Sequence, residues 1–313
     1  MPIPVLFHAG PGRWEEYERP LTEAAHAAGL ELDIGPDLEP ARARYIVYAP
    51  WTDDTPRLDL AALPELRAVL SLWAGIESIV DEVPREVPLT RMVDDGLTRG
   101  MVEYVTGHVL RHHLGMDAHI VNPGHVWAQA APPLARDRRV TILGLGALGQ
   151  HCAETLVALG FDVTGWSRSP KQIAGVRCLS GDEGFGAALD GAEIVVLLLP
   201  LTAATENVLD AAALARLAPG AVVINPGRGG LVDDAALLAA LDTGQVGHAT
   251  LDAFRVEPLP PSDPYWAHPK VTVTPHIASE TRPATAARVI VENIRRAEGG
   301  DPLLHQVDRA AGY

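Results

Sequence analysis

The chain has 313 residues, a length that fits about two domains of ordinary size. Hydrophobic residues make up 47% of it and charged residues 21%, which is the composition of a globular protein and excludes a fully disordered chain. The formal net charge is −15, and because nucleic acid and anionic membranes repel such a surface, we expect neither as a partner.

The N-terminal part of the chain predicts a small α/β domain. Short β-prone runs at residues 5–7, 45–49 and 68–72 accompany an Ala- and Glu-rich segment at residues 17–29, which ends in glycine as helices do. Residues 99–121 follow as one long predicted helix, with apolar side chains at roughly helical spacing and an Asn-Pro-Gly sequence after it.

Strands and helices alternate in the second half. Six apolar runs are predicted as strands: residues 140–143, 161–166, 194–199, 221–225, 248–252 and 271–274. Helical segments lie between them at residues 149–159, 211–217 and 234–241. This alternation is typical of parallel strands, so we predict a doubly wound α/β sheet, followed by an amphipathic helix at residues 283–298.

The run GLGALG at residues 144–149 fits the dinucleotide-binding pattern G-x-G-x-x-G, and it joins a predicted strand to a predicted helix. Gly144 permits the tight turn, Gly146 lets the backbone approach a pyrophosphate, and Gly149 lets helix and strand pack closely. Free N–H groups at the start of the helix then bind the phosphates, and we include Ala147 and Leu148 in this site. A plain glycine turn is the structural alternative.

The residues that lie about 20 positions further on select the cofactor. A carboxylate there would bind the ribose 2′-hydroxyl of NAD, but the sequence reads GWSRSPK at residues 165–171 and has none. Ser167, Arg168, Ser169 and Lys171 offer hydroxyl groups and two cations instead, which suit the 2′-phosphate of NADP. We predict NADP as the preferred cofactor, with Arg168 as the partner of that phosphate and NAD as a possible substitute.

Three charged side chains follow successive predicted strands. Arg228, Glu257 and His276 each lie just past a strand's carboxyl end, where open α/β sheets bind ligands. Arginine offers a planar, permanent charge to a substrate carboxylate. Histidine can protonate a carbonyl oxygen near neutral pH, and a neighbouring carboxylate raises its pKa. Each residue alone has an ordinary structural explanation, but together they predict the reduction of a 2-keto acid.

In combination, these motifs resemble the D-isomer-specific 2-hydroxyacid dehydrogenase family over almost the whole chain, and within it the glyoxylate/hydroxypyruvate reductases. The resemblance rests on the runs at residues 144–149, 166–169, 199–202, 225–229, 251–254, 257–260 and 274–278. It implies that Arg228 binds the substrate carboxylate, that His276 is the general acid/base and that Glu257 is the partner of that histidine. The expected substrate is a small 2-keto acid, and the product is the 2-hydroxy acid.

The resemblance also implies further site residues. Asp252 helps to place the nicotinamide, and the rest of the cofactor groove comprises Leu199, Pro200, Thr205, Pro226, Gly227 and Ala278. The turn of Trp73, Ala74 and Gly75 offers backbone N–H groups to the substrate carboxylate, and Trp51 forms a pocket wall unless it is only packed at the surface. Glu77 and Gly227 replace the family's usual Asp and Ala, which leaves the preferred substrate open.

The domain organisation is a further implication of the resemblance. Residues 1–98 and 284–313 are expected to form a smaller, discontinuous, flavodoxin-like α/β substrate domain. Residues 99–283 are expected to form the Rossmann dinucleotide-binding domain. The long helix at residues 99–121 resembles the family's dimerisation arm, so we expect a homodimer.

Other functions stay open on the sequence alone. NAD-dependent oxidation of another D-2-hydroxy acid, such as phosphoglycerate, is disfavoured because no carboxylate lies near Arg168. A dinucleotide-sensing interaction protein would not need the Arg228, Glu257 and His276 set. His108 and His112 have the spacing of a zinc-binding pair, but the sequence has no HExxH and hydride transfer needs no metal, so we predict no metal site.

The cysteines and the apolar runs indicate the compartment. Cys152 and Cys178 form no CxxC pair, so we expect no disulfide framework and a cytoplasmic location. The longest apolar run, residues 194–201, is much shorter than the ~18 residues of a membrane span. The first residues lack the charged region and long apolar run of a signal peptide.

Overall fold

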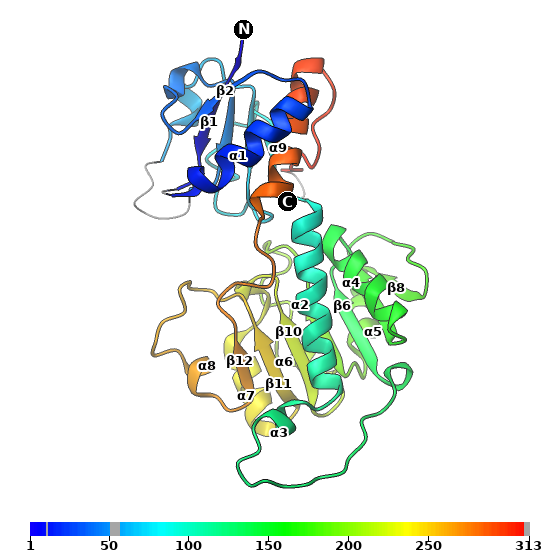
Figure 1. Cartoon of the computed structure of the whole chain (residues 1–313). Coiled ribbons are helices and arrows are strands. Elements are labelled where there is room, and N and C mark those ends of the chain that lie inside the picture. Colours follow the sequence, from blue (N-terminus) through cyan, green and yellow to red (C-terminus); the bar gives the residue numbers. More distant parts are fainter. Residues whose placement is uncertain (11, 51–56, 310–313) are drawn as a thin grey trace. The chain divides into compact units, whose positions relative to one another are not determined.

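The chain folds into two compact units, which a computed structural model describes for residues 1–10, 12–50 and 57–309. Unit 1 comprises Met1–Leu97 and Glu280–Tyr313, and unit 2 comprises Thr98–Ser279. Each unit contains one parallel β-sheet with helices beside it (Figure 1). Among the described residues, no helix has the length and apolar character that a membrane crossing requires.

The sheet of unit 1 has the strand order β2-β1-β3-β4-β5. Its strands are β1 (Ile3–His8), β2 (Leu32–Gly35), β3 (Tyr45–Tyr48), β4 (Ala68–Ser71) and β5 (Leu89–Thr90), and all pairs are parallel. Helices α1 (Arg13–Ala27) and α9 (Pro283–Gly299) lie side by side (Figure 1). Two short 3₁₀ helices are Pro40–Arg42 and Leu60–Ala62. This strand order is that of flavodoxin, which confirms the predicted fold of the smaller domain.

Alternating side chains explain why the inner strands of this sheet are mostly apolar. Val5 and Phe7 of β1 pack in a core with Leu21 of α1 and Ile290 of α9. Leu6, between them, packs in the core on the opposite face of the sheet. Because both faces are buried, every position of such a strand favours a hydrophobic residue.

The sheet of unit 2 has the order β12-β11-β10-β9-β6-β7-β8, and all its pairs are parallel. Its strands are β6 (Arg139–Leu143), β7 (Asp162–Ser167), β8 (Val176–Ser180), β9 (Ile194–Leu197), β10 (Ala221–Asn225), β11 (Val246–Leu251) and β12 (Val271–Val273). This is the Rossmann order with one more strand, and the predicted doubly wound sheet is confirmed. The order reverses between β6 and β9, so their carboxyl ends open the crevice in which such sheets bind ligands.

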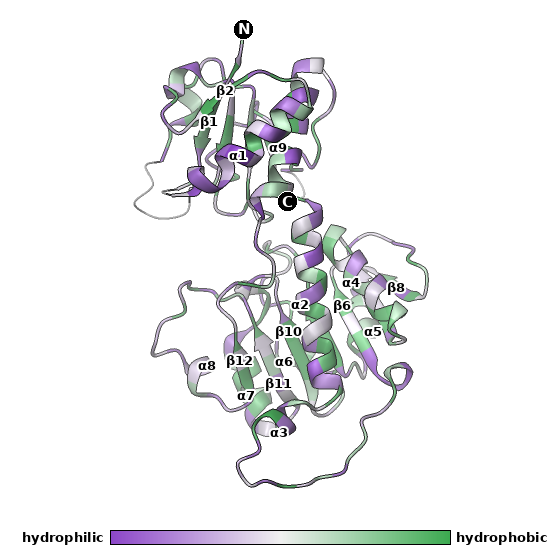
Figure 2. Ribbon diagram, in the orientation of Figure 1, coloured by the Kyte–Doolittle hydropathy of each residue, from purple (hydrophilic) through white to green (hydrophobic). Residues whose placement is uncertain are grey.

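Helices cover both faces of this sheet. Apolar residues of α2 (Asp95–His113) and α4 (Ala147–Ala158) pack in the core on one face. The other core includes residues of α5 (Gly181–Leu189), α6 (Ala211–Ala215) and α7 (Asp234–Thr243). The remaining short helices are α3 (Asp117–Ile120), α8 (Pro264–Ala267) and the 3₁₀ helices Ala135–Asp137 and Gly229–Leu231. In Figure 2, β10 is mostly hydrophobic, whereas α2 carries both hydrophobic and hydrophilic residues.

The predicted helix at residues 99–121 is wrong at its C-terminal end. Helix α2 ends at His113, and Gly115 follows with a left-handed φ of 64°. The Met116 N–H donates to the Arg111 carbonyl at 3.1 Å and the Gly115 N–H to the His112 carbonyl at 3.2 Å. These are the two hydrogen bonds of a Schellman helix end, which a glycine in this position favours.

Candidate active site

The glycine turn after β6 has the geometry of a phosphate cradle. Gly144 has a φ of 107°, and a Cβ added there would lie 2.5 Å from the Leu198 carbonyl oxygen. A Cβ on Gly149 would lie 1.8 Å from the carbonyl oxygen of Gly144, so only glycine lets α4 approach β6 this closely. A Cβ on Gly146 would meet nothing within 4 Å. The middle glycine therefore has open space beside it, as a bound pyrophosphate requires.

Helix α4 begins directly after this turn and spans Ala147–Ala158. Its N-cap is Gly146, which has no side chain to cap the N–H groups of the first helical turn. Backbone N–H groups at a helix start lack partners within the helix, and together with the helix dipole they attract anions. Ala147 and Leu148 thus lie where the sequence predicted phosphate contacts, and the residues present fit a dinucleotide.

The residues predicted to select the cofactor lie at the end of β7, next to β6. The Gly144 N–H donates to the Trp166 carbonyl at 2.8 Å, which joins this strand end to the glycine turn. Ser167 is buried, and its hydroxyl donates to the Ser169 carbonyl at 2.7 Å. Arg168 and Lys171 are exposed immediately after it. The Ser167 hydroxyl therefore stabilises the turn, and the side chains of Arg168 and Lys171 lie on the protein surface.

A histidine–carboxylate pair lies beyond β11 and β12. His276 Nδ1 and Glu257 Oε2 are 2.7 Å apart, and the other carboxylate oxygen accepts the Phe254 N–H at 2.8 Å. This geometry directs one ring nitrogen to the carboxylate and leaves Nε2 for a substrate. The sequence predicted this pairing across 19 positions of the chain.

Hydrogen bonding and charge shift the pKa values of this pair in opposite directions. The hydrogen bond to Glu257 raises the pKa of His276 above its usual value, and it outweighs the effect of burial and the repulsion by Arg228. Burial would raise the pKa of Glu257, but the hydrogen bonds from His276 and the Phe254 N–H lower it below its usual value. The pair therefore favours a protonated histidine beside an ionised carboxylate.

Asp252 anchors the loop that carries His276. Its buried carboxylate accepts Thr274 Oγ1 at 2.6 Å and the N–H groups of Ile277 and Ala278 at 2.9 and 2.8 Å. Tyr104 Oη on α2 lies 2.7 Å from Thr274 Oγ1. The sequence did not indicate this anchoring contact of Tyr104, because nothing in the helical spacing of α2 identifies a partner in the loop after β12.

His276 itself has an unusual backbone conformation. Its φ is 54°, a left-handed value that costs energy in a residue with a side chain. Its N–H lies 3.0 Å from the carbonyl oxygens of both Asp252 and Thr274. The loop is thus held on both sides of His276, and this fixes the direction in which the histidine side chain points.

Arg228 follows β10 and completes the constellation. It lies beyond the carboxyl end of its strand, as Glu257 and His276 do, and its positive charge lowers the pKa values of both groups. Its Nη1 donates to the Gly227 carbonyl at 2.7 Å. The Asn225 side chain braces the turn, since it accepts the Gly227 N–H at 3.1 Å and donates to the Arg228 carbonyl at 2.9 Å. The sequence shows Asn225 only as part of a motif, and its bracing role depends on the folded turn.

The remaining predicted residues fall into three groups. Pro226 lies buried in the Arg228 turn, Leu199 is buried after β9, and Thr205 Oγ1 donates to the Pro200 carbonyl at 2.6 Å. Trp73, Ala74 and Gly75 belong to unit 1, where they follow β4 and are partly exposed. Trp51 lies outside the described residues.

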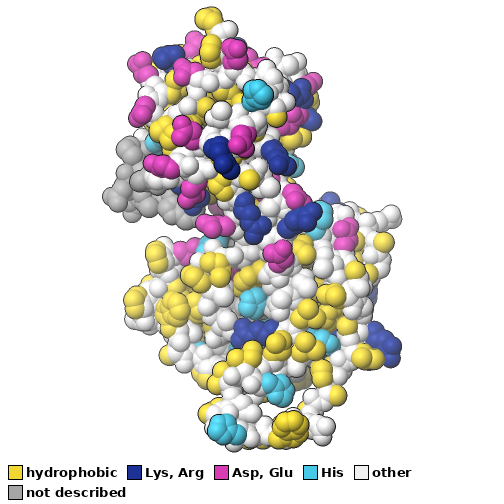
Figure 3. Space-filling model, in the orientation of Figure 1, with side chains coloured by type: hydrophobic (Ala, Val, Ile, Leu, Met, Phe, Trp, Pro, Cys, Tyr) yellow, Lys and Arg dark blue, Asp and Glu magenta, His cyan; other side chains and the backbone are white. Residues whose placement is uncertain are grey.

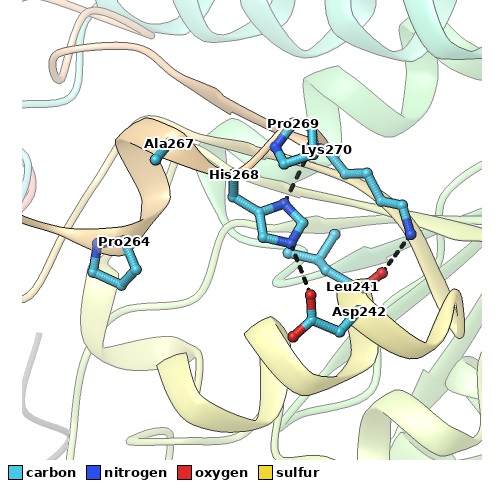
Figure 4. A pocket seen from close by; sticks show the side chains of 7 residues that line it. All are labelled: Leu241, Asp242, Pro264, Ala267, His268, Pro269 and Lys270. Atoms are coloured by element: carbon cyan, nitrogen blue, oxygen red, sulfur yellow. Dashed lines mark hydrogen bonds and ion pairs between the residues drawn. The ribbon is translucent and has the colours of Figure 1, made fainter.

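A separate pocket lies at the opposite end of the unit 2 strands. Its lining residues are Leu241, Asp242, Pro264, Ala267, His268, Pro269 and Lys270 (Figure 4). Lys270 Nζ donates to the Leu241 carbonyl, and His268 Nε2 lies 3.4 Å from Asp242 Oδ1. Leu241 and Asp242 lie just before β11, and residues 264–270 lie just before β12. Arg228, Glu257 and His276 instead lie beyond the carboxyl ends of β10, β11 and β12. The pocket is therefore distinct from the candidate active site.

The histidines of α2 are partly or fully buried in the fold of unit 2. His112 Nε2 lies 2.9 Å from Thr250 Oγ1, and its ring centroid lies 4.8 Å from that of His248. Burial lowers the pKa of His108, and it lowers that of His112 to about 3. Within the described ranges, no group of three or more His, Cys, Asp or Glu side chains is arranged to bind a metal ion.

A glycine cradle at the switch point of a doubly wound sheet, with a histidine–carboxylate pair and an arginine at the same edge, defines a dinucleotide-dependent oxidoreductase. Residues 108–278 match the family model described as the NAD-binding domain of D-isomer specific 2-hydroxyacid dehydrogenases. The chain belongs to this family.

Named relatives and solved structures agree with this assignment. The glyoxylate/hydroxypyruvate reductase A of Serratia proteamaculans is 40% identical over 262 residues, which cover 81% of this chain and 84% of the relative. A D-isomer specific 2-hydroxyacid dehydrogenase from Xanthobacter autotrophicus, solved with NADPH and MES, superposes with a TM-score of 0.92 at 40% identity and full coverage of both chains. An NADPH-dependent glyoxylate/hydroxypyruvate reductase from Sinorhizobium meliloti, solved with NADP and sulfate, gives 0.86 at 36% identity, covering 100% of this chain and 99% of its own.

Proposed function

We propose that this protein reduces a small 2-keto acid, glyoxylate or hydroxypyruvate, to the 2-hydroxy acid with NADPH. The observation that carries the proposal is the 2.7 Å contact between His276 and Glu257, because it keeps a proton donor ready for the keto oxygen. Arg228, whose charge acts on the same pair, supplies the cation for the substrate carboxylate. The names of the Serratia and Sinorhizobium relatives support the substrate, and the NADPH and NADP in two related structures support the cofactor.

Each residue has a defined task in this mechanism. Residues 144–149 and the start of α4 would hold the dinucleotide, which supplies a hydride to the keto carbon when bound. Arg228 binds the substrate carboxylate. His276 holds a proton at Nε2 for the keto oxygen, and Glu257 at Nδ1 stabilises the imidazolium before that proton leaves.

The two units have different proposed roles. We assign residues 1–98 and 284–313 to substrate binding, with the backbone of Trp73, Ala74 and Gly75 as further ligands of the carboxylate and Trp51 as a pocket wall. Residues 99–283 are assigned to the dinucleotide, whose groove includes Leu199, Pro200, Thr205, Pro226, Gly227, Asp252 and Ala278. The family relationship supports these assignments.

Initial rates of nicotinamide oxidation test the function directly. Glyoxylate, hydroxypyruvate and pyruvate are each supplied with NADPH and then with NADH. We expect rapid oxidation of NADPH with the first two acids and a much slower reaction with NADH. No turnover with any pair would contradict the proposed reaction, and a preference for NADH would contradict only the cofactor.

Arg168 provides the test of cofactor choice. Replacing it in Arg168→Gln removes a cation from the 2′-phosphate, and a charge-assisted hydrogen bond contributes about 1.5–3 kcal/mol. The KM for NADPH should therefore rise roughly 10- to 100-fold, while the KM for NADH changes little. Arg177→Gln, which removes an exposed arginine from β8, is the matched control. If the two substitutions change the KM for NADPH equally, Arg168 has no specific role in binding the cofactor.

We further propose a homodimer, which the segment after α2 supports. Hydrophobic side chains are exposed there: Leu114, Met116, Ile120, Val121, Val126, Trp127 and Leu134. Trp127 is 92% exposed, and exposed apolar clusters mark interaction surfaces. Figure 3 shows hydrophobic side chains, some beside histidines, on the visible face of unit 2.

The double substitution Ile120→Asp and Trp127→Asp tests this surface. It should convert a dimer to a monomer in sedimentation velocity, because charges buried at an interface lose hydration. Leu159→Asp, at an exposed position after α4, should leave the dimer intact. A wild-type chain that sediments as a monomer would refute the proposed dimer.

We propose a cytoplasmic location on the evidence of the thiols. Cys152 is buried and Cys178 is partly buried, and neither forms a disulfide. Free cysteines are typical of reducing compartments. Fractionation of the source cells would place the activity with the cytoplasmic markers, and enrichment in another fraction would refute the location.

A further inference from the structure

The side chain of Arg255 is the centre of a polar network that the proposed mechanism does not use. Its Nε donates to Asp234 Oδ2 at 3.1 Å, and its Nη2 donates to the Val232 carbonyl at 2.6 Å. The same Nη2 donates to Asn207 Oδ1, and Nη1 forms an ion pair with Glu206 at 3.6 Å. The Arg255 side chain is 34% exposed, so these contacts are only partly screened by water.

The partners of Arg255 come from two other turns at the carboxyl edge of the sheet. Glu206 and Asn207 lie in the turn after β9, whereas Val232 and Asp234 follow β10. Backbone hydrogen bonds already join these two turns, since the Asn207 N–H donates to the Gly230 carbonyl at 2.8 Å. Arg255 lies after β11 and attaches the third turn to both.

The turns that carry Arg228 and Arg255 are also in close backbone contact. A Cβ added to Gly229, the residue after Arg228, would lie 2.0 Å from the carbonyl carbon of Phe254 and 2.4 Å from the Arg255 nitrogen. This approach is possible only because Gly229 has no side chain. A displacement of the Arg255 turn would therefore be transmitted to the neighbourhood of Arg228.

The same turn orients the catalytic carboxylate. The Phe254 N–H, one residue before Arg255, donates to Glu257 Oε1 at 2.8 Å. The second oxygen of that carboxylate then lies 2.7 Å from His276 Nδ1. Arg255 lies between Phe254 and Glu257 in the chain, so its anchoring limits how far either of them can move.

We propose that Arg255 is a positioning residue for the dehydrogenase reaction, acting through Glu257. Its guanidinium fixes the turn after β11 against the turns after β9 and β10. This keeps Glu257 hydrogen-bonded to His276 and keeps Arg228 next to that pair. This inference rests on the proposed function and adds a residue to its site. An interaction between oriented groups is sensitive to small displacements, since a shift of about 1 Å can cost roughly 10²-fold in rate.

The substitution Arg255→Met tests the proposal because methionine keeps much of the side-chain length and loses every polar contact. We expect kcat to fall roughly 10- to 100-fold, with the KM for NADPH unchanged. The pKa of His276, followed by NMR and assigned by its absence in His276→Asn, should fall toward its ordinary value. Loss of a cation alone would move that pKa upward, so a fall shows that Glu257 has left the histidine.

The charged groups around His276 make this readout specific. Glu257, Arg228 and Asp252 all influence its pKa. The Arg255 turn contacts Glu257 through the Phe254 N–H and the Arg228 turn through Gly229. Withdrawal of Arg228 would raise the pKa of His276 and withdrawal of Glu257 would lower it, so a fall reports the loss of Glu257. Arg255→Lys should recover part of kcat, because an ammonium can keep one ion pair. Arg216→Met is the matched control, since Arg216 pairs with Asp190 far along the chain from the site.

A second variant keeps the test valid if Arg255→Met does not fold. Asn207 has a φ of 52°, so Asn207→Gly removes its side-chain acceptor in a backbone conformation that glycine accepts readily. It should also lower kcat and the pKa of His276, but by less than Arg255→Met does. If both variants retain wild-type kcat and the wild-type pKa of His276, Arg255 has no positioning role.

The outcomes separate this inference from the proposed function. Absence of turnover in the wild-type protein refutes the proposed reaction. The NMR titration needs no turnover, so it still reports whether Arg255 holds Glu257 against His276.

Discussion

At the residue scale, the candidate active site depends on a carboxylate that keeps a histidine protonated. Glu257 Oε2 lies 2.7 Å from His276 Nδ1, and this hydrogen bond is the main cause of the raised pKa of the histidine. His276 has a left-handed φ of 54°, and Asp252 accepts hydrogen bonds from its N–H and from Thr274 and Ile277 on either side of it. The site therefore combines an electrostatic and a conformational constraint on one side chain.

The substitution Glu257→Gln should separate these two constraints. Glutamine can still bond to the ring but has no charge, so the pKa of His276 should fall. Reduction needs the protonated histidine, and the rate is lost as pH rises through its pKa, so the alkaline limb of the kcat/KM profile should move to lower pH. His276→Asn is the comparison and should lose roughly 10²–10⁴-fold at pH values where the wild-type histidine is protonated. Superimposable wild-type and Glu257→Gln profiles would contradict the assigned role of Glu257.

At the element scale, the β6–α4 connection shows two distinct uses of glycine. Gly149 has no space for a side chain, because an added Cβ would lie 1.8 Å from the Gly144 carbonyl oxygen. Gly146 has open space and a φ of −75°, which any residue adopts. The first of these glycines serves packing of the helix on the strand, and the second serves the proposed ligand.

Two alanine substitutions should therefore have different effects. Gly149→Ala should lower the free energy of unfolding by about 1–3 kcal/mol or more, because the added methyl overpacks the junction. Gly146→Ala should change the stability by less than about 0.5 kcal/mol and still raise the KM for NADPH. Urea unfolding and steady-state kinetics measure these quantities. A normal KM in Gly146→Ala would contradict the proposed phosphate site.

At the scale of the whole molecule, partly buried histidines make stability depend on pH. His108 and His112 on α2 and His248 on β11 have lowered pKa values, chiefly because burial disfavours their charged forms. His112, with a pKa of about 3, remains neutral in the folded state far below the pKa of about 6.5 that it has when unfolded. Between those values the unfolded chain binds more protons than the folded chain.

Stability should consequently decrease as pH falls below about 6.5, by an amount on the order of a few kcal/mol at pH 4. Urea midpoints at pH 7.5, 6 and 5 measure the loss in a range where most carboxylates are still ionised. His112→Asn, which offers an amide to Thr250 and does not titrate, should flatten the dependence. A wild-type profile with no slope between pH 7.5 and 5 would show that these histidines do not remain neutral in the fold.

The amino-acid sequence alone was enough to predict the parallel architecture, the glycine turn and the catalytic candidates. Hydrophobic runs separated by helical segments indicate parallel strands, and the carboxyl ends of such strands share one edge. Because of that geometric rule, the order of the strands is enough to group Arg228, Glu257 and His276. The edge strands β2, β5 and β8 were not predicted, because short or half-exposed strands have a weak hydrophobic pattern.

The contacts that hold those candidates in place are visible only in the folded chain. Arg255 meets Asn207 across 48 positions of the chain, and Asp252 meets Ala278 across 26. Such contacts depend on strand register, loop conformation and side-chain rotamers, none of which has a local sequence pattern. The kind of chemistry is thus encoded in residue types and strand order, whereas its alignment depends on hydrogen bonds that form only when distant turns come together.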